Sequence, residues 1–215
     1  MTNNIDINSA DNDIKNKAIE IYNEALRKHR DNSYSVLFSP SAQMTRFNHL
    51  IKSIDICEPG ISILDVGCGN GALFDFLKAR GFSGVYTGYD VNDNLLAKAR
   101  LKFLKETANF ENVDILLQKQ QPKFDYILMS GLFNSDYGQS FDWICRFVHA
   151  MFGLSRRAVI FNAISTHVNR RDDSMYYIDP CALLDYIIRN VKPAATLLHD
   201  MPIFNFQIEL RQDRR

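Results

Sequence analysis

The sequence lacks an excess of charge of either sign. Its 25 lysines and arginines match its 25 aspartates and glutamates, so the net charge is zero when the histidines are neutral. Proteins that bind nucleic acid usually carry a basic surface, although a local basic patch is compatible with a balanced total. A nucleic-acid partner is therefore not expected.

Long apolar runs and paired cysteines are also missing. No apolar run reaches the length of about 18 residues that a membrane-spanning helix needs. The first 17 residues are polar and lack the apolar segment of a signal peptide. The four cysteines stand far apart, with no CxxC pair for zinc or for a redox dithiol. We therefore expect a cytoplasmic protein with reduced thiols and no membrane partner.

The chain is long enough for one sizeable domain, or for a core with an appended segment. Apolar residues recur at helical spacing over 14–30, and a second amphipathic helix is expected after Ser41, which could cap it. Pro59 and Gly60 then break the chain. We expect an N-terminal helical lid segment, 1–58, followed by a core, 59–215.

In the core, short apolar runs alternate with segments of helical periodicity. Such alternation is typical of a mostly parallel sheet covered by helices on both faces, with right-handed crossovers. The expected strands are 61–66, 84–90, 108–116, 124–130 and 157–165, and the helical segments between them are 72–80, 92–106 and 140–152.

The last fifty residues follow a different pattern. Asp179 is placed to cap a helix that has Pro180 in its first turn. Two strands, 195–200 and 202–210, then follow with a turn signal between them. Strands joined this closely must run antiparallel.

The most informative motif is ILDVGCGNGA, residues 63–72, a glycine-rich turn between a predicted strand and a predicted helix. Glycine lets a ligand approach the backbone closely, because no Cβ intervenes and positive φ costs little. Gly67, Gly69 and Ala72 satisfy the pattern GxGxxG/A, so a nicotinamide or flavin dinucleotide is a rival ligand. The loop alone does not decide between them.

Two acids favour a nucleoside without a pyrophosphate. Asp65 lies within the strand before the loop, where it would repel a phosphate and suit a cationic group. Asp90 ends the next strand, where it could accept hydrogen bonds from ribose hydroxyls. Each acid taken alone has a structural explanation: Asp65 could be satisfied by backbone amides, and Asp90 could cap the following helix.

With these acids, the segments 63–77, 86–100 and 124–134 resemble the class I S-adenosylmethionine-dependent methyltransferases over roughly residues 59–165. The resemblance implies an α/β fold, a Rossmann-like seven-stranded sandwich whose mostly parallel sheet has an antiparallel last strand. It also implies S-adenosylmethionine as the cofactor.

The resemblance assigns cofactor contacts to individual residues. Asp65 would reach toward the aminoacyl end of the cofactor, and Gly67 and Gly69 would pass beneath the adenosine. Asp90 would take the two ribose hydroxyls, and Val91 would lie against the adenine.

The third and fourth strands add two positions. An acid after the third strand commonly contacts the adenine amino group in this family, and Asp114 is the candidate, with Gln118 as the alternative in another register. The fourth strand ends in Ser130 and Gly131, which leave room for cofactor and acceptor. The Asn or Asp, two prolines and aromatic typical of adenine-N6 and glutamine methyltransferases are missing there.

The catalytic candidates are His167, just beyond the fifth strand, as a base, and Tyr137, in a loop expected over the pocket. Tyr176 and Tyr177 are expected to form an aromatic wall. Methyl transfer needs alignment of the acceptor and exclusion of water more than it needs an acid or base. Asp136 is the lone acid after the fourth strand, so no metal is expected.

The segment before the core resembles the lid helix of small-molecule members of the superfamily. Arg46 could then pair with the cofactor carboxylate through two parallel hydrogen bonds. Tyr34 and Phe38 would help to close the pocket and exclude water.

The sequence thus favours a methyltransferase that acts on an oxygen or nitrogen of a small-molecule acceptor. A nicotinamide-dependent oxidoreductase and a non-catalytic S-adenosylmethionine-binding partner subunit are the alternatives, and RNA methylation is a minor one. No oligomeric state is predicted.

Overall fold

The computed structural model describes residues 7–29, 37, 39–117, 122–201 and 204–212. Tyr34, Phe38 and Gln118, which the sequence singled out, lie outside the described residues.

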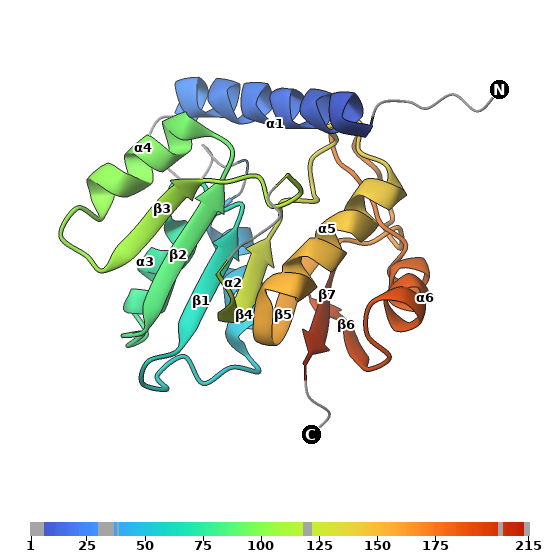
Figure 1. Ribbon diagram of the computed structural model, residues 1–215. Helices are drawn as coiled ribbons and strands as arrows, with labels where there is room; N and C mark the ends of the chain where they lie inside the picture. Colours follow the sequence, from blue (N-terminus) through green and yellow to red (C-terminus); the bar gives the residue numbers. More distant parts are fainter. Residues whose placement is uncertain (1–6, 30–36, 38, 118–121, 202–203, 213–215) are drawn as a thin grey trace.

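A seven-stranded sheet forms the centre of the molecule (Figure 1), with strand order β3-β2-β1-β4-β5-β7-β6. Pairing is parallel from β3 through β5, whereas β7 runs antiparallel to both of its neighbours. The expected fold class is thereby confirmed. The strands are β1 (Ser62–Val66), β2 (Val85–Asp90), β3 (Ala108–Asn112), β4 (Phe124–Ser130), β5 (Ser155–Ile164), β6 (Ala195–Met201) and β7 (Asn205–Arg211).

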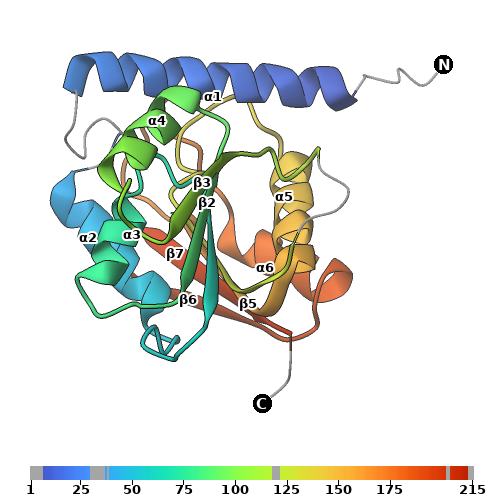
Figure 2. The same ribbon diagram turned by 60° about the vertical axis from the view of Figure 1, so that its left-hand side comes forward.

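Helices cover both faces of the sheet, as Figure 2 shows. One apolar cluster joins the face that carries Leu64 to α5 (Phe141–Leu154) and α6 (Pro180–Asn190). The opposite face, which carries Ile63, packs on α2 (Pro40–Ile51), α3 (Ala72–Lys78) and α4 (Asp93–Lys102). Alternate residues of β1 are therefore buried on opposite faces of the sheet, as is typical of a central parallel strand.

The two N-terminal helices lie in different places. α1 (Ile7–His29) crosses the edge of the sheet where the parallel strands end (Figure 1). α2 instead lies on a face of the sheet, because Phe47 and Leu50 belong to its buried apolar cluster. α2 therefore packs as part of the sandwich, and the division into a lid segment, 1–58, and a core, 59–215, stays a prediction.

Local capping fixes several helix starts. α2 begins earlier than the sequence indicated, because Ser39, and not Ser41, accepts the hydrogen bond from the Ala42 amide at 3.3 Å. Asp179 caps α6 as predicted, accepting from the amides of Cys181 and Ala182.

Candidate functional site

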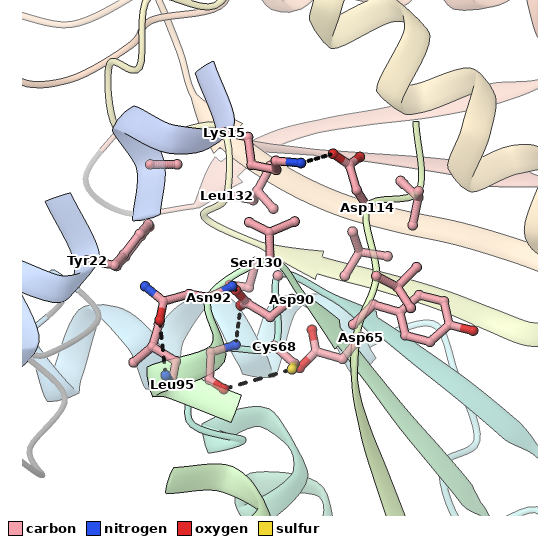
Figure 3. A pocket seen from close by; sticks show the side chains of 18 of the residues that line it. Lys15, Tyr22, Asp65, Cys68, Asp90, Asn92, Leu95, Asp114, Ser130 and Leu132 are labelled. Atoms are coloured by element: carbon pink, nitrogen blue, oxygen red, sulfur yellow. Dashed lines mark hydrogen bonds and ion pairs between the residues drawn. The ribbon is translucent and has the colours of Figure 1, made fainter. Parts of the chain in front are cut away.

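A cavity that is lined in part by α1 opens at the carboxyl ends of β1, β2 and β4. This is the edge at which open α/β sheets bind ligands. Its walls come from α1, α2, the glycine loop, the segments after β2, β3 and β4, and α5. Figure 3 shows several of the side chains that line it, among them Asp65, Asp90 and Asp114. The predicted cofactor residues all line this cavity: Arg46, Asp65, Gly67, Gly69, Asp90, Val91, Asp114 and Ser130.

The glycine loop forms the floor of the cavity. Gly67 has a φ of 74°, a backbone conformation that favours glycine. A Cβ there would also lie 2.6 Å from Cδ1 of Leu132, so the end of that side chain would have to shift. The amides of Gly67 and Cys68 donate to the carbonyl of Tyr89 at 2.8 and 3.1 Å. The loop is thereby fixed to the end of β2.

Asp90 faces the loop and is held by backbone amides. Gly69 N–H donates to its Oδ2 and Asn92 N–H to its Oδ1, each at 2.8 Å. Burial raises the pKa of the Asp90 carboxyl above its ordinary value, while these amides act in the opposite direction. The helix-capping role that the sequence left open belongs to Asn92, whose side chain accepts from the amides of Asn94 and Leu95.

Asp65 is 3% exposed and lies in the same cavity. Its Oδ2 accepts a hydrogen bond from the Tyr86 hydroxyl at 2.6 Å. Burial raises the pKa of Asp65 to about 7; the Tyr86 hydrogen bond lowers it, and the charge of Asp90 raises it. Because burial disfavours the ionised form of Asp65, a cationic ligand group beside it would stabilise that form strongly.

Arg46 reaches the cavity from α2 and is 4% exposed. Burial lowers the pKa of its guanidinium to about 10, and the guanidinium therefore remains charged at neutral pH. The cavity thus places the carboxylates of Asp65 and Asp90 together with the buried guanidinium of Arg46, which matches a ligand that carries charges of both signs.

The adenine side of the predicted site contains an ion pair. Nζ of Lys15, on α1, lies 3.8 Å from Oδ2 of Asp114 (Figure 3), while Oδ1 of Asp114 accepts from the Leu116 amide at 3.1 Å. Ser130, at the end of β4, accepts from Nδ2 of Asn162 at 3.4 Å. Both predicted residues therefore have protein partners as well as a place in the wall.

The two predicted catalytic residues lie in different places. Tyr137 lines the cavity, is 4% exposed and has its hydroxyl 3.2 Å from that of Tyr22, on α1. His167 lies outside the lining, with its ring 5.9 Å from that of His199. Tyr176 and Tyr177 also lie outside the lining, so the expected aromatic wall is formed from other side chains.

That wall consists of Trp143 and Phe147 on α5, with Leu132 after β4. Sequence reasoning treated α5 as a packing helix and missed these residues. It also missed Lys15 and Tyr22, whose seven-residue spacing places them on one face of α1. That spacing was the available signal, because the same face also carries Asp11 and Ala18, which line the cavity.

Hydrogen bonds at two places along α1 hold this helix over the cavity. Arg146 on α5 donates from its two terminal nitrogens to Asp11, at 2.6 and 2.7 Å. Further along α1, the Asn92 side chain donates to the carbonyl of Ile19 at 3.3 Å and to Oδ1 of Asn23 at 3.0 Å. The helix therefore connects α5 with the start of α4.

Metal centres and membrane spans are not found in the part of the chain that the structure describes. Among the described residues, no group of three or more His, Cys, Asp or Glu side chains is arranged to hold a metal ion. None of the described helices is long and apolar enough to cross a membrane.

Comparison with known proteins gives consistent results. Residues 64–141 match the family model described as "Methyltransferase domain". The Mycobacterium tuberculosis protein named "Putative methyltransferase Rv1506c" is 34% identical over 169 residues, which cover 75% of this chain and 99% of that protein.

Two solved structures share the fold at low sequence identity. The DhpI structure in complex with S-adenosylhomocysteine (SAH) has a TM-score of 0.66 at 14% identity, covering 94% of this chain and 99% of DhpI. The magnesium protoporphyrin IX methyltransferase ChlM from Synechocystis PCC 6803, with bound SAH, has a TM-score of 0.65 at 12% identity, covering 97% of this chain and 100% of ChlM. With the motif, the fold and the relative in agreement, the chain belongs to the class I S-adenosylmethionine-dependent methyltransferases.

Proposed function

We propose that this methyltransferase transfers a methyl group from S-adenosylmethionine to an oxygen or nitrogen of a small-molecule acceptor that enters the cavity beneath α1. The observation that carries the proposal is the buried carboxylate of Asp65 and the half-buried carboxylate of Asp90, which line one cavity with the buried guanidinium of Arg46. S-adenosylmethionine carries a sulfonium, an ammonium and a carboxylate, so its charges complement this set.

The use of the loop amides argues against a dinucleotide. In a dinucleotide site, the pyrophosphate lies against the glycine loop and the N-terminus of the following helix. Here the Gly69 amide already donates to Asp90. A pyrophosphate would have to replace that carboxylate while lying close to Asp65, so a nicotinamide cofactor fits poorly.

Each predicted residue has a defined task in the proposal. Asp90 accepts the ribose hydroxyls, Asp65 faces the ammonium group, and Arg46 pairs with the cofactor carboxylate. Val91 and Asp114 lie at the adenine. The main contribution of such a site is to align the acceptor with the methyl carbon and to exclude water.

The chemical step requires little from the protein. When bound, S-adenosylmethionine would supply an electrophilic methyl carbon to the acceptor lone pair, with the electron pair of the broken carbon–sulfur bond left on sulfur and the acceptor's proton passing to water. Asp65, Asp90 and Arg46 would hold it there. Tyr137 is the predicted catalytic residue that lies in the cavity, and we propose that it orients the acceptor by hydrogen bonding. The same geometry does not support His167 as the base, because it lies outside the lining.

A small acceptor is favoured by the enclosure of the site. α1 lies over the cavity, and the wall beyond the acids is built from Trp143, Phe147 and Leu132. Such a wall suits an apolar or aromatic molecule better than a nucleic-acid backbone. ChlM, which shares the fold, is a magnesium protoporphyrin IX methyltransferase and so is named for a small acceptor. Cytoplasmic location stays a prediction.

Calorimetric titration with SAH and with NAD tests the cofactor, and a panel of phenols, amines and heterocycles tests the acceptor. We expect one SAH per chain, no heat with NAD, and release of SAH with at least one acceptor. Binding of NAD alone would contradict the proposal. SAH binding without turnover on the whole panel would favour the non-catalytic alternative. Turnover on RNA that modest salt suppresses would favour a nucleic-acid acceptor.

A further inference from the structure

Tyr86 is a buried residue to which the proposed function gives no role. It lies on β2, is 0% exposed and belongs to the apolar cluster on the α2, α3 and α4 face of the sheet. Its ring centroid lies 4.7 Å from that of Phe74 and 5.7 Å from that of Phe110. A phenylalanine would fill the same space, so packing alone does not explain the hydroxyl.

The hydroxyl is directed at the cofactor site. It donates to Oδ2 of Asp65 at 2.6 Å. The sheet register makes this contact possible, because Ile63 pairs with Tyr86 and Asp65 pairs with Gly88, so Tyr86 and Asp65 are diagonal neighbours on one face. Gly88 adds no side chain between them. One carboxylate oxygen is thereby fixed inside the protein, while Asp65 still lines the cavity.

We propose that Tyr86 is a positioning residue for the cofactor: by holding one oxygen of Asp65, it directs the other oxygen toward the cavity to receive the cofactor ammonium group. This inference rests on the proposed function, because it requires that Asp65 face the aminoacyl end of the cofactor.

The charge state of Asp65 gives the proposal a measurable signature. The ionisable groups that interact with Asp65 are Tyr86, Asp90 at the end of β2 and Cys68 in the loop, and Arg46 from α2 lines the same cavity. Burial raises the pKa of Asp65 to about 7, the Tyr86 hydrogen bond opposes that rise, and Asp90 adds to it. Burial also raises the pKa of Cys68, which stays a neutral thiol. Only ionised Asp65 attracts an ammonium group, so affinity should fall as pH decreases through this pKa.

The test measures SAH affinity by calorimetry between about pH 5.5 and 8.5. It uses the wild-type protein, Tyr86→Phe and the matched control Tyr126→Phe. Tyr126 is a buried phenol of the same apolar cluster, on β4, and lies outside the cavity lining. Removing the Tyr86 hydroxyl raises the pKa of Asp65. The midpoint of the affinity profile should therefore move to higher pH, with roughly tenfold weaker binding at pH 7, a scale of about 1.4 kcal/mol. Tyr126→Phe should follow the wild-type profile.

The outcomes separate the inference from the proposed function. If wild type binds SAH and Tyr86→Phe has the wild-type midpoint, the positioning role is overturned while the proposed function stands. If wild type binds no SAH at any pH, the proposed function fails, and the inference fails with it.

A second measurement does not depend on the folding of Tyr86→Phe. In wild-type protein labelled with ζ-¹³C tyrosine, one resonance should titrate with the Asp65 midpoint near pH 7 and stop titrating in Asp65→Asn. The absence of such a resonance would overturn the inference.

Discussion

Asp65→Asn should make the unliganded protein more stable while weakening its hold on the cofactor. In the folded protein, burial raises the pKa of Asp65 to about 7 from an ordinary value of 3.8. The folded state therefore holds the proton more tightly than the unfolded state. The contribution of Asp65 to the free energy of unfolding therefore falls as pH rises between these two values. Above pH 7, ionised Asp65 destabilises the unliganded folded protein.

The magnitude follows from the difference of about three pKa units, at 1.36 kcal/mol per unit. Asparagine is neutral, occupies nearly the same volume and can still accept the Tyr86 hydrogen bond. Its advantage over aspartate should grow from about 2 kcal/mol near pH 5 to about 4 kcal/mol near pH 8. Cofactor affinity should change in the opposite direction, because the amide brings no charge to an ammonium group.

Urea unfolding between pH 5 and pH 8, without ligand, measures the stability difference, and calorimetry with SAH measures affinity. Asp173→Asn, at an exposed loop position, controls for the loss of one negative charge. A pH-independent stability difference, or an Asp65→Asn protein less stable than wild type at pH 8, would refute the reasoning. Equal SAH affinity in the two proteins would remove Asp65 from the binding site.

Three further substitutions test other parts of the site. Asp90→Ala should weaken SAH binding by about 1.5–3 kcal/mol, the scale of hydrogen bonds to a charged group, and unchanged calorimetric affinity would exclude Asp90 from the site. Arg46→Gln should weaken the binding free energy of SAH by roughly 2 kcal/mol and leave that of 5′-methylthioadenosine, which lacks the carboxylate, unchanged. An equal loss of affinity for both ligands would argue against a contact between Arg46 and the carboxylate. Gly67→Ala should lower the free energy of unfolding by more than Gly60→Ala, because both glycines have a φ of 74° but only a Cβ at position 67 would meet Leu132. Equal losses in urea unfolding would show that Leu132 moves aside at no cost.

Much of the fold could be predicted from the sequence, because strand and helix periods alternate clearly from Ile63 onward. The expected third strand, 108–116, ends at Asn112, since Asp114 accepts from the Leu116 amide and turns the chain. β5 begins at Ser155, two residues before the apolar run that marked it. Both differences concern strand ends, where local side-chain hydrogen bonds decide the boundary.

The placement of the N-terminal helices depended on long-range contacts. Both helices have an apolar stripe, and such a stripe does not indicate which surface of the protein it packs against. Phe47 and Leu50 bury against the sheet. Ile14 and Tyr22 instead face the cavity and its surrounding core. Sequence periodicity therefore predicted the helices but not their layers.

The candidate site was predictable where a motif fixed the spacing, as for Gly67 and Asp90. It was not predictable where distant elements meet. Tyr86 reaches Asp65 only because β1 and β2 pair in one register. Lys15 reaches Asp114 only because α1 crosses the edge of the sheet. His167 carried suitable chemistry beyond a suitable strand, but the chain after β5 leads it away from the cavity lining.

The proposed chemistry depends most on the nucleoside lying between the carboxylates of Asp65 and Asp90, and a crystal structure with SAH bound tests this directly. We predict that Asp90 accepts both ribose hydroxyls and that the free oxygen of Asp65 faces the ammonium group, with Tyr86 still bound to the other oxygen. SAH bound elsewhere, or held with both carboxylates turned away from it, would contradict this placement and the function built on it.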